Sequence, residues 1–420
     1  MTEATENKRR KPQGSKKTGG KFRILKRVLI SVGLSIVLLL FLVWLLIFSV
    51  AHGPSPSMRD LLVTSAMQAS ATKFVPYLVL PASEVEDIMA RAASGGESVY
   101  DPTQFSERYI HKIITDKDGK QYEITVLQGD NGTAVVTDEH GSQVVEYDEW
   151  EYAIDGIQYL RIDRPSFRAY MMIIKDPSRV YTGTSSDYSK DVAGKRFWEM
   201  AEQEGCVALM NAGEFYDAGG QGDGGKPQGL TYSKGKCVYS DDNTWKTFVG
   251  FTKDNKMVVG ENITKAMAEN MGMRDGVCFR PATYSSSSRL IYTDDAGKLH
   301  VATFNSDAPA QRSAIGQRAD GAVIFLVTDG RSATSLGASY NDMTQMLLSY
   351  GAVNACMLDG GSSAMLYSRN AMQYYELFKW DTAHLDEYQQ MGLLNKYVAA
   401  TRPRRIPTYW CVAPSGGANE

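Results

Sequence analysis

A long apolar run lies near the start of the chain. Residues 28–50, VLISVGLSIVLLLFLVWLLIFSV, are 23 consecutive residues without a charge. At about 1.5 Å per residue a helix of this length reaches roughly 35 Å, enough to cross a hydrocarbon core of about 30 Å with some tilt. The apolar core of a cleaved signal peptide usually runs only about 7–15 residues. We therefore predict an uncleaved transmembrane helix over residues 28–50, with a signal peptide cut near residues 49–51 as the alternative.

The pattern after the apolar run predicts a membrane-proximal stem. HGPSPS is a short Pro/Ser stalk, and residues 58–93 hold two helical patterns. SGGES at residues 94–98 has the composition of a linker. Residues 51–98 are therefore interpreted as a stalk and a helical stem.

From about residue 105 the pattern changes to short alternating segments separated by the turn signals KDGK, GDNG and DEHG. Further along, helical patterns precede apolar strands, as in RFWEMAEQEG before CVALMNAG and NDMTQMLLSYG before AVNACMLDGG. We therefore expect an α/β (mixed α+β) fold, a mixed sheet with flanking helices. Residues 99–149 form its β-rich lead-in, and residues 150–415 form the main folded domain.

The charge distribution predicts the orientation of the apolar helix. Residues 1–27 form a basic tail with ten Lys or Arg against two Glu, and the rest of the chain carries 35 basic and 46 acidic residues. By the positive-inside rule the tail lies in the cytoplasm and everything after residue 51 lies outside the cell. The expected location is a single-pass protein of the cell membrane. The acidic remainder lacks the basic footprint of a nucleic-acid-binding protein.

Several chemistries are discounted by motif. The five cysteines are scattered without a CxxC pair, so metal-ligand spacing is absent and we predict no disulfide. The histidines fall in no HExxH pattern, and no GxSxG nucleophile elbow occurs. Residues 218–230, AGGQGDGGKPQGL, nearly fit a nucleotide P-loop, but Pro227 follows the lysine and prevents the required helix. We expect this stretch to be a mobile lid, and we expect no required cofactor.

Three apolar strands end in the same way, in a polar residue followed by glycine. CVALM precedes Asn211-Ala212-Gly213-Glu214, AVIFLVT precedes Asp329-Gly330-Arg331, and CML precedes Asp359-Gly360-Gly361. Asp-Gly is also a common turn dipeptide, so one such motif indicates only the end of a strand. Three of them indicate a ligand site, because sheet ends are where such folds bind ligands and glycine lets backbone N–H groups face an anion.

The residue types at these strand ends suit glycosyl transfer to or from a phosphate. Asp329 and Asp359 are a candidate pair of general acid and base or nucleophile, of which one holds a proton while the other stays ionised. Arg331 follows one carboxylate, and Arg312 and Arg404 lie near the other motifs, where guanidinium groups bind phosphate oxygens. The spacing along the chain leaves retaining and inverting chemistry both open.

Four stretches together resemble the phosphodiester glycosidase family. They are MNAGEFYDAGGQGDGGKPQGL, RSAIGQRADGAVIFLVTDGR, SLGASYNDMTQMLLSYGAVNACMLDGGSSAMLY and RRIPT, in matching order and spacing over roughly residues 150–415. The resemblance implies hydrolysis of a sugar-1-phosphodiester, often of N-acetylglucosamine, at the glycosidic bond. The anchor and stem resemble those of membrane-anchored bacterial members, which implies an extracellular catalytic domain acting on cell-envelope or exopolysaccharide glycans.

The resemblance also implies the site residues. The expected catalytic group is Asp359, Asp329 and Asn211, joined by Glu214, which stands where relatives carry a small or apolar residue and is a candidate third acid. The expected substrate- and phosphate-binding residues are Arg312, Arg331, Gly213, Gly330, Gly360, Gly361, Ser362, Ser363 and Arg404. Gln311-Arg312-Ser313 replaces the family's Pro-Arg-Thr, a departure that concerns the substrate more than the chemistry.

Two other functions stay open. A metal-dependent phosphodiesterase would break the P–O bond with Mg²⁺ or Ca²⁺ on Asp329, Asp359 and Glu214, since carboxylates suit these ions. A non-catalytic glycan-binding protein of envelope biogenesis would keep the fold without turnover. The sugar, the leaving group, any metal and the oligomeric state are not given by the sequence.

Overall fold

The computed structural model describes most of the chain. The described residues are 18–68, 72–93, 95–100, 110–115, 121–128, 133–137, 144–148, 153–217, 222–241, 247–280, 287–304, 308–330, 332, 335–377, 382–397 and 402–416. The chain divides into two compact units, Met1–Arg59 and Asp60–Glu420, and each is described by itself.

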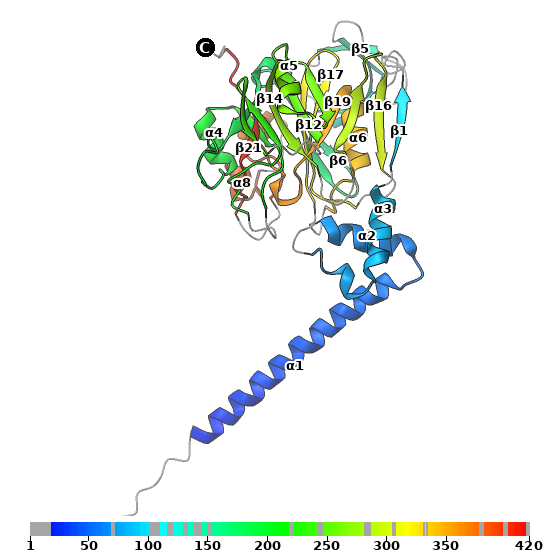
Figure 1. The fold of residues 1–420 in the computed structure, drawn as a ribbon, viewed down its shortest axis with the longest axis vertical. Coiled ribbons are helices and arrows are strands. Elements are labelled where there is room, and N and C mark those ends of the chain that lie inside the picture. Colours follow the sequence, from blue (N-terminus) through cyan, green and yellow to red (C-terminus); the bar gives the residue numbers. More distant parts are fainter. Residues whose placement is uncertain are drawn as a thin grey trace, which may run out of the picture. The chain divides into compact units, whose positions relative to one another are not determined.

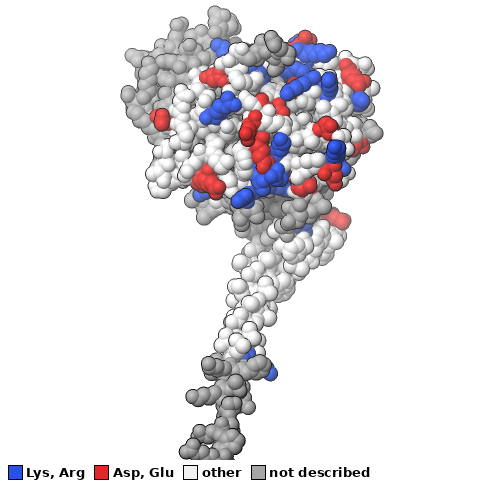
Figure 2. All heavy atoms as spheres, turned by 90° about the vertical axis from the view of Figure 1, so that its left-hand side faces the viewer, with Lys and Arg blue, Asp and Glu red and all other residues white. Residues whose placement is uncertain are grey.

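The first unit contains one long helix, α1 (Thr18–Ala51). Its segment Leu25–Ala51 is long and apolar enough to cross a membrane by length and composition. Large apolar side chains such as Leu29, Leu34 and Leu46 are exposed along it. From Val28 to Ala51 it carries no charged residue, and Lys26 and Arg27 lie at the start of the segment (Figure 2). The predicted apolar helix is therefore confirmed, and its helical conformation begins earlier than residue 28.

The predicted stem contains the helices α2 (Pro56–Gln68), η1 (Pro76–Leu78) and α3 (Ala82–Ala93). The predicted linker at residues 94–98 is different. Gly95–Tyr100 form strand β1, which pairs antiparallel with β16 (Leu299–Phe304) from Gly95↔Phe304 to Tyr100↔Leu299. Its small and polar residues suit an exposed edge position, where a partner strand supplies the hydrogen bonds, so composition alone misread it as a linker.

The largest sheet has eight strands in the order β1-β16-β15-β19-β17-β18-β7-β6 (Figure 1). The remaining strands are β15 (Arg289–Thr293), β19 (Ala352–Leu358), β17 (Ser313–Arg318), β18 (Val323–Thr328), β7 (Arg168–Ile174) and β6 (Ile157–Asp163). The central strand β18 has six consecutive buried residues, VIFLVT, because both faces of the sheet are covered.

The two faces of this sheet bury two separate cores. Along β7, Tyr170 and Met172 point into one core and Met171 and Ile173 into the other, which follows from the two-residue period of a strand. Helix α6 (Tyr340–Ser349) covers the second core, and Ser339 caps its first turn. The first core is covered by the smaller sheets, so the eight-stranded sheet is the middle layer of the unit.

Three further sheets complete the described strands. One has the order β20-β9-β21-β8, with β20 (Leu366–Ser368), β9 (Ala208–Asn211), β21 (Thr408–Val412) and β8 (Val180–Thr184). Another has the order β11-β10-β14-β12-β13, with β11 (Lys236–Ser240), β10 (Leu230–Ser233), β14 (Met273–Phe279), β12 (Thr247–Thr252) and β13 (Met257–Glu261). The third contains β2 (Ile110–Thr115), β3 (Gln121–Gln128), β4 (Thr133–Thr137) and β5 (Val144–Asp148).

Short helices join these strands: η3 (Pro177–Arg179), α4 (Phe197–Glu204), α5 (Lys265–Asn270), η5 (Gly361–Ser363), α7 (Ala371–Leu377) and α8 (Glu387–Gln390). The predicted class, mixed helices and sheets, is confirmed. The described ladders are antiparallel, so the parallel component expected of a mixed sheet does not occur among them.

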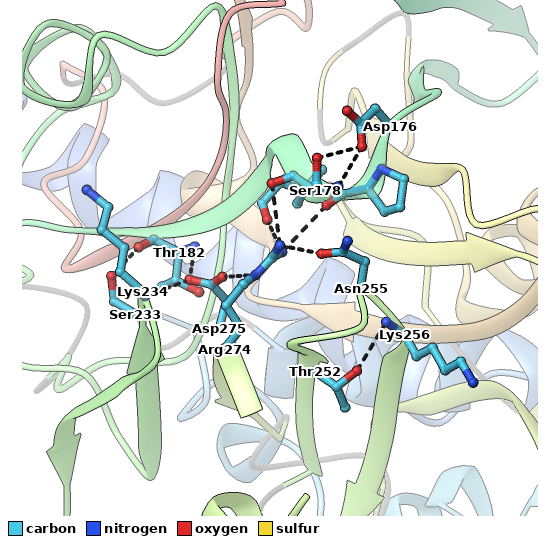
Figure 3. A network of polar contacts seen from close by, with 12 residues as sticks. Asp176, Ser178, Thr182, Ser233, Lys234, Thr252, Asn255, Lys256, Arg274 and Asp275 are labelled. Atoms are coloured by element: carbon cyan, nitrogen blue, oxygen red, sulfur yellow. Dashed lines mark hydrogen bonds and ion pairs between the residues drawn. The ribbon is translucent and has the colours of Figure 1, made fainter. Parts of the chain in front are cut away.

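A buried ion pair on β14 joins three segments of the fold (Figure 3). Asp275 is fully buried and accepts hydrogen bonds from Arg274 Nε at 2.7 Å, Thr182 N at 2.9 Å and Lys234 N at 3.1 Å. Arg274 also donates to Asn255 Oδ1 and to the carbonyl of Val180, each at 2.5 Å. Burial raises the pKa of Asp275, and the positive charge of Arg274 opposes this. The pair thereby ties β8 and β10 to β14.

A second polar cluster fastens β1 to the sheet. His300 on β16 lies between two carboxylates, with Nδ1 2.6 Å from Glu97 Oε1 and Nε2 2.9 Å from Asp294 Oδ2. Tyr292 stacks on the imidazole at 4.4 Å and donates to Glu97 at 3.3 Å. Ionised carboxylates only accept, so both ring nitrogens donate and the ring is cationic. The contacts with Asp294 and Glu97 raise the pKa of His300 above its usual value.

Asp275→Ala leaves the Arg274 guanidinium and two backbone N–H groups without their acceptor. We expect it to lower the free energy of unfolding by about 3–5 kcal/mol, the usual cost of breaking a buried pair. Asp163→Ala removes an exposed partner of Arg161 and Arg168 and is the matched control, expected to cost less than about 1 kcal/mol. Urea unfolding measures both; equal losses would show that the Asp275 pair does not stabilise the fold.

Docking of β1 should weaken as the pH rises. A raised His300 pKa contributes stability that is complete below the unfolded value of about 6.5 and is lost as the pH rises through the folded value. Amide exchange protection of Gly95–Tyr100 should therefore be lower at about pH 9 than at about pH 6, after correction for intrinsic rates. His300→Gln should remove this difference. Amide exchange protection that does not change with pH in the unsubstituted protein would contradict the assignment of His300 as a cation.

Candidate active site

Two of the predicted strand ends meet at one edge of the eight-stranded sheet. β18 and β19 flank β17 and run in the same direction, because each is antiparallel to it; Ser313 at the start of β17 pairs with both Leu358 and Val327. Asp329 and Asp359 follow these strands directly. Two strand spacings of about 4.8 Å place their backbones roughly 10 Å apart.

Gln311 lies between the two strand ends. Its carbonyl accepts from Gly361 N at 2.9 Å, and its side chain donates to the carbonyl of Lys396 at 3.2 Å. An added Cβ at Gly330 would come within 2.5 Å of Gln311 N, and one at Gly360 within 2.8 Å of Gln311 O. The two glycines therefore serve the close approach of both strand ends to one backbone segment.

Asp359 is half-buried directly after the end of β19, and its pKa is raised. Burial raises its pKa to about 7, against the hydrogen bond from the Ser363 hydroxyl, which lowers it. The negative charge of Glu214 and Asp217 raises the pKa further, and the positive charge of Arg404 lowers it. Asp359 therefore holds a proton in part of its population near neutral pH, as a general acid requires.

Asp329 is more deeply buried and lies in a different polar environment. Its Oδ1 accepts from Lys396 N at 2.8 Å and its Oδ2 from the Tyr170 hydroxyl at 3.4 Å. Burial raises its pKa to about 6; the Lys396 N–H, the charge of Arg168 and the Tyr170 hydroxyl act in the opposite direction. The acidic side chains that act on Asp359 are Glu214 and Asp217, from the loop after β9, rather than Asp329.

Asn211 at the end of β9 holds this arrangement together. Its Nδ2 donates to the carbonyl of Asp359 at 2.5 Å, and its Oδ1 accepts from the Ser313 hydroxyl at 2.7 Å and from Met365 N at 3.1 Å. Asn211 is fully buried. These contacts are those of a positioning residue, although the sequence grouped Asn211 with the catalytic side chains.

The stretch after Asn211 brings further predicted residues to Asp359. Gly213 N donates to the Thr408 hydroxyl at 3.2 Å, and Glu214 N donates to the carbonyl of Cys278 at 2.9 Å. Glu214 Oε2 accepts from Arg280 N at 3.4 Å. The loop after β9 is thus fixed between β14 and β21, with the Glu214 carboxylate close enough to act on Asp359.

The turn of Gly360, Gly361, Ser362 and Ser363 is only partly available to a ligand. Gly361 N donates to Gln311 O, and Ser363 N donates to Gly360 O at 3.1 Å. The N–H groups of Gly360 and Ser362 have no acceptor among the described residues. A backbone cradle for an anion at this turn would therefore rest on these two groups.

The predicted arginines are already engaged with the protein. Arg312 is buried; it donates to the carbonyls of Ala308 at 2.8 Å and Ala338 at 3.2 Å and lies over the Tyr340 ring at 4.4 Å. Arg404 forms an ion pair with Asp217. Arg331 lies outside the described residues. On the face drawn in Figure 2, basic and acidic side chains are interspersed, whereas a nucleic-acid-binding face gathers basic residues.

The described part of the predicted lid, residues 222–230, is tied to the body of the unit. Gly194 N donates to Asp223 O at 3.0 Å, and Tyr216 N donates to Lys226 O at 3.1 Å. Gln228 N donates to the carbonyl of Glu214 at 2.9 Å. These backbone groups pair with Gly194 and with the loop that carries Glu214, and the mobility of the lid stays a prediction.

Comparison with known proteins identifies the family. The sequence model of the phosphodiester glycosidase family (NAGPA) matches residues 204–413, half of the chain. The chain belongs to the phosphodiester glycosidase family. The match contains Asn211, Asp329 and Asp359, and so spans all three strand ends.

A curated relative of this family member is distant. The SPbeta prophage-derived uncharacterized protein YomE of Bacillus subtilis (strain 168) is 27% identical over 204 residues, which cover 45% of this chain and 27% of YomE. The chain therefore spans about a quarter of the length of this curated relative.

Two solved structures are similar at lower identity. The zebrafish N-acetylglucosamine-1-phosphodiester alpha-N-acetylglucosaminidase catalytic domain, auto-inhibited by its pro-peptide, is 16% identical with a TM-score of 0.44 over 61% of this chain and 82% of that chain. A hypothetical protein from Synechocystis is 14% identical with a TM-score of 0.37 over 64% of this chain and 65% of that chain.

Sequence reasoning missed three residues of the candidate site. Asp217 acts on Asp359 and binds Arg404, Lys396 donates its backbone N–H to Asp329, and Gln311 joins the two strand ends. An acid three residues after Glu214, separated from Gly219-Gly220 by one alanine, was a usable signal for Asp217. Lys396 and Gln311 act mainly through backbone atoms, which no motif reveals.

The possible metal site is not formed by the described side chains of this family member. Among them, no group of three His, Cys, Asp or Glu is placed to hold a metal ion. Glu214 and Asp359 lie near each other, while Asp329 is held separately by Lys396 and Tyr170. The three carboxylates of the metal hypothesis therefore do not converge in this arrangement.

Asn211→Ala tests the positioning role. It leaves the Ser313 hydroxyl and Met365 N without their buried acceptor, so we expect the free energy of unfolding to fall by about 2–4 kcal/mol. Asn354→Ala on β19 removes an exposed hydrogen bond from Thr293 N and should cost less than about 1 kcal/mol. Urea unfolding compares the two. Equal losses would mean that the buried bonds of Asn211 do not hold the site.

Proposed function

We propose that this chain is a membrane-anchored extracellular hydrolase that cleaves the glycosidic bond of sugar-1-phosphodiesters in cell-envelope or exopolysaccharide glycans, with an N-acetylglucosamine-type sugar. Family membership supports the reaction class. The apolar segment Leu25–Ala51, preceded by a basic tail, supports the anchor and its orientation. The single observation that carries the catalytic proposal is Asp359, a strand-end carboxyl with its pKa raised to about 7 beside Glu214.

In this proposal the two carboxyl environments supply the two roles. Asp359 protonates the leaving oxygen, because its raised pKa lets it hold a proton where Asp329, with a pKa of about 6, is mostly ionised. A water molecule attacks the anomeric carbon and gives its proton to a carboxylate, Asp329 or Glu214. The bond between the anomeric carbon and oxygen breaks, and the phosphate leaves as a monoester with its three other oxygens unchanged.

The remaining predicted residues bind and orient in this scheme. The N–H groups of Gly360 and Ser362, which have no acceptor among the described residues, would bind phosphate oxygens. Asn211 fixes the carbonyl of Asp359 and so the direction of its side chain. Arg312 supports the start of β17 through Ala308 and Ala338, and its positive charge would favour a nearby anion.

The test uses the full chain in detergent with UDP-N-acetylglucosamine in ¹⁸O-labelled water. We expect free sugar and UDP without ¹⁸O in its phosphates, because the carbon–oxygen bond is cut. Asp359→Asn should lower kcat by about a hundredfold or more, since a positioned acid contributes roughly 10²–10⁴ in rate. Asp163→Asn, an exposed carboxylate on β6, is the matched control and should keep full activity. Mass spectrometry of both products gives the result.

Other products would identify other functions. Sugar 1-phosphate and UMP, one of them carrying ¹⁸O, would mean that the P–O bond is cut, and loss of that activity in EDTA would favour the metal-dependent phosphodiesterase. Saturable glycan binding without turnover on a panel of sugar-1-phosphodiesters would favour the non-catalytic glycan-binding protein. Full turnover by Asp359→Asn would show that Asp359 is not the acid.

A further inference from the structure

Asp217 and Arg404 form a bidentate ion pair beside the proposed acid, Asp359. Arg404 Nη1 donates to Asp217 Oδ2 at 2.8 Å and Nη2 donates to Oδ1 at 2.6 Å, so the guanidinium binds the carboxylate with both terminal nitrogens. Gly222 N donates to Asp217 Oδ1 at 2.8 Å. The Arg404 side chain is 16% exposed and the Asp217 side chain 22%, so water screens the ion pair only weakly.

Further contacts fix the orientation of this pair. Arg404 lies over the Phe215 ring at 4.9 Å, and its Nη2 also donates to Gly222 O at 3.3 Å. Burial favours the neutral form of Asp217, but the Arg404 pair and the Gly222 N–H outweigh it and hold the pKa of Asp217 below its usual value. The Asp217 carboxylate is therefore ionised when it binds Arg404.

The pair acts on Asp359 from two directions. The charged groups that face Asp359 are Glu214 and Asp217 in the loop after β9 and Arg404 before β21, while Ser363 donates to it within its own turn. Arg404 has a larger effect on Asp359 than Asp217 has, and the two effects are opposite in sign. The position of the Arg404 guanidinium therefore contributes to the electrostatic balance at the acid, where it opposes the negative charges of Glu214 and Asp217.

Two donors beside this pair have no acceptor in the described part of the chain. The Nε–H of Arg404 has no acceptor there, since the hydrogen bonds of this side chain all come from its terminal nitrogens. The Tyr397 side chain is more than nine-tenths buried, and its hydroxyl makes no hydrogen bond of good geometry in the described part of the chain, although the backbone N–H of Arg404 acts on it and lowers its pKa. A buried hydroxyl donor without an acceptor is rare, and an anionic ligand would accept from this O–H and from Arg404 Nε–H.

We propose that Asp217 is a positioning residue of this site: it fixes the Arg404 guanidinium beside Asp359, with Nε–H and the neighbouring Tyr397 hydroxyl left to bind the substrate phosphate. This assignment rests on the proposed function, because it locates the phosphate subsite of that reaction. Asp217 does not touch the reacting atoms; it acts through Arg404.

The positioning role makes a prediction that is opposite in sign to that of a bystander anion. If Asp217 were only a nearby negative charge, Asp217→Asn would make Asp359 more acidic. If Asp217 fixes Arg404, the same substitution also releases Arg404, whose effect is the larger, and Asp359 becomes less acidic. Arg404→Gln should raise the pKa of Asp359 by about one unit, which is the lower end of the effect of a nearby charge.

The experiment measures the protonation of Asp359 directly in the full chain in detergent. A carbodiimide activates protonated carboxyls for coupling to an amine, and peptide mass spectrometry reads the extent of coupling at Asp359 against pH. We expect the midpoint to move to higher pH in Arg404→Gln and, by a smaller amount, in Asp217→Asn. Glu199→Gln breaks the similar two-nitrogen pair of the adjacent Arg405 and should leave the midpoint unchanged.

Kinetics with the phosphodiester substrate test the phosphate subsite. We expect KM to rise by about tenfold to a hundredfold in Arg404→Gln, since hydrogen bonds to charged groups are stronger than neutral ones, and severalfold in Asp217→Asn and Tyr397→Phe. kcat of Tyr397→Phe should be nearly unchanged. Glu199→Gln is again the matched control, with both constants as in the unsubstituted protein.

The two readouts separate failure of this inference from failure of the proposed function. A midpoint that moves to lower pH in Asp217→Asn, or that does not move, would show that Arg404 stays in place without Asp217 and would overturn the positioning role. Absence of turnover by the unsubstituted protein on all sugar-1-phosphodiesters would overturn the proposed function, while the coupling profile would still decide whether Asp217 positions Arg404.

Discussion

The site depends above all on the buried carboxamide of Asn211. This one side chain joins the end of β9 in the four-stranded sheet to the start of β17 and to the turn after β19 in the eight-stranded sheet. Apolar side chains fill most of the contact between the two sheets and attract without direction. Two further polar contacts link the sheets: the Tyr159 and Ser368 hydroxyls lie 2.9 Å apart, and Asp359 N donates to the carbonyl of Ala212 at 3.3 Å. A directional contact is therefore needed to set the register between the loops that carry Glu214 and Asp359. Asn is suited to this, because its amide donates and accepts at the same time.

Burial then determines the chemistry at the polar edge. Both strand-end carboxyls have raised pKa values, to about 7 for Asp359 and about 6 for Asp329, and in both the largest cause is desolvation. Their neighbours differ. Asp329 is supported by backbone and hydroxyl donors, whereas Asp359 faces two further carboxylates and one arginine. Because β17 separates the two strand ends, each acid has its own charge environment. Two acids in direct contact would instead titrate as a coupled pair.

The sequence was informative where candidate site residues stand at the ends of strands, and uninformative about contacts between distant parts of the chain. Apolar runs ending in Asn211, Asp329 and Asp359 were readable, because strands bury continuous side chains and polar residues mark their ends. The meeting of β18 and β19 on either side of β17 was not, since antiparallel pairing over long sequence separation leaves no local pattern. The arginines show the same limit: their types suggested phosphate binding, but the carbonyls of Ala308 and Ala338 that hold Arg312 are invisible in a motif. The composition of SGGES likewise suggested a linker, because the partner strand β16 lies about two hundred residues away.

The edge position of β1 determines what cleavage near the stem would do to the eight-stranded sheet. A single residue separates the end of α3 at Ala93 from the start of β1 at Gly95. Protease sites are usually exposed, unpaired segments, and here the chain between stem and sheet offers very few such residues. A cut within β1 would remove one of the two partners of β16 and expose a row of unpaired backbone groups to other chains. Cleavage at this junction would therefore leave a sheet with an open edge that is prone to aggregation.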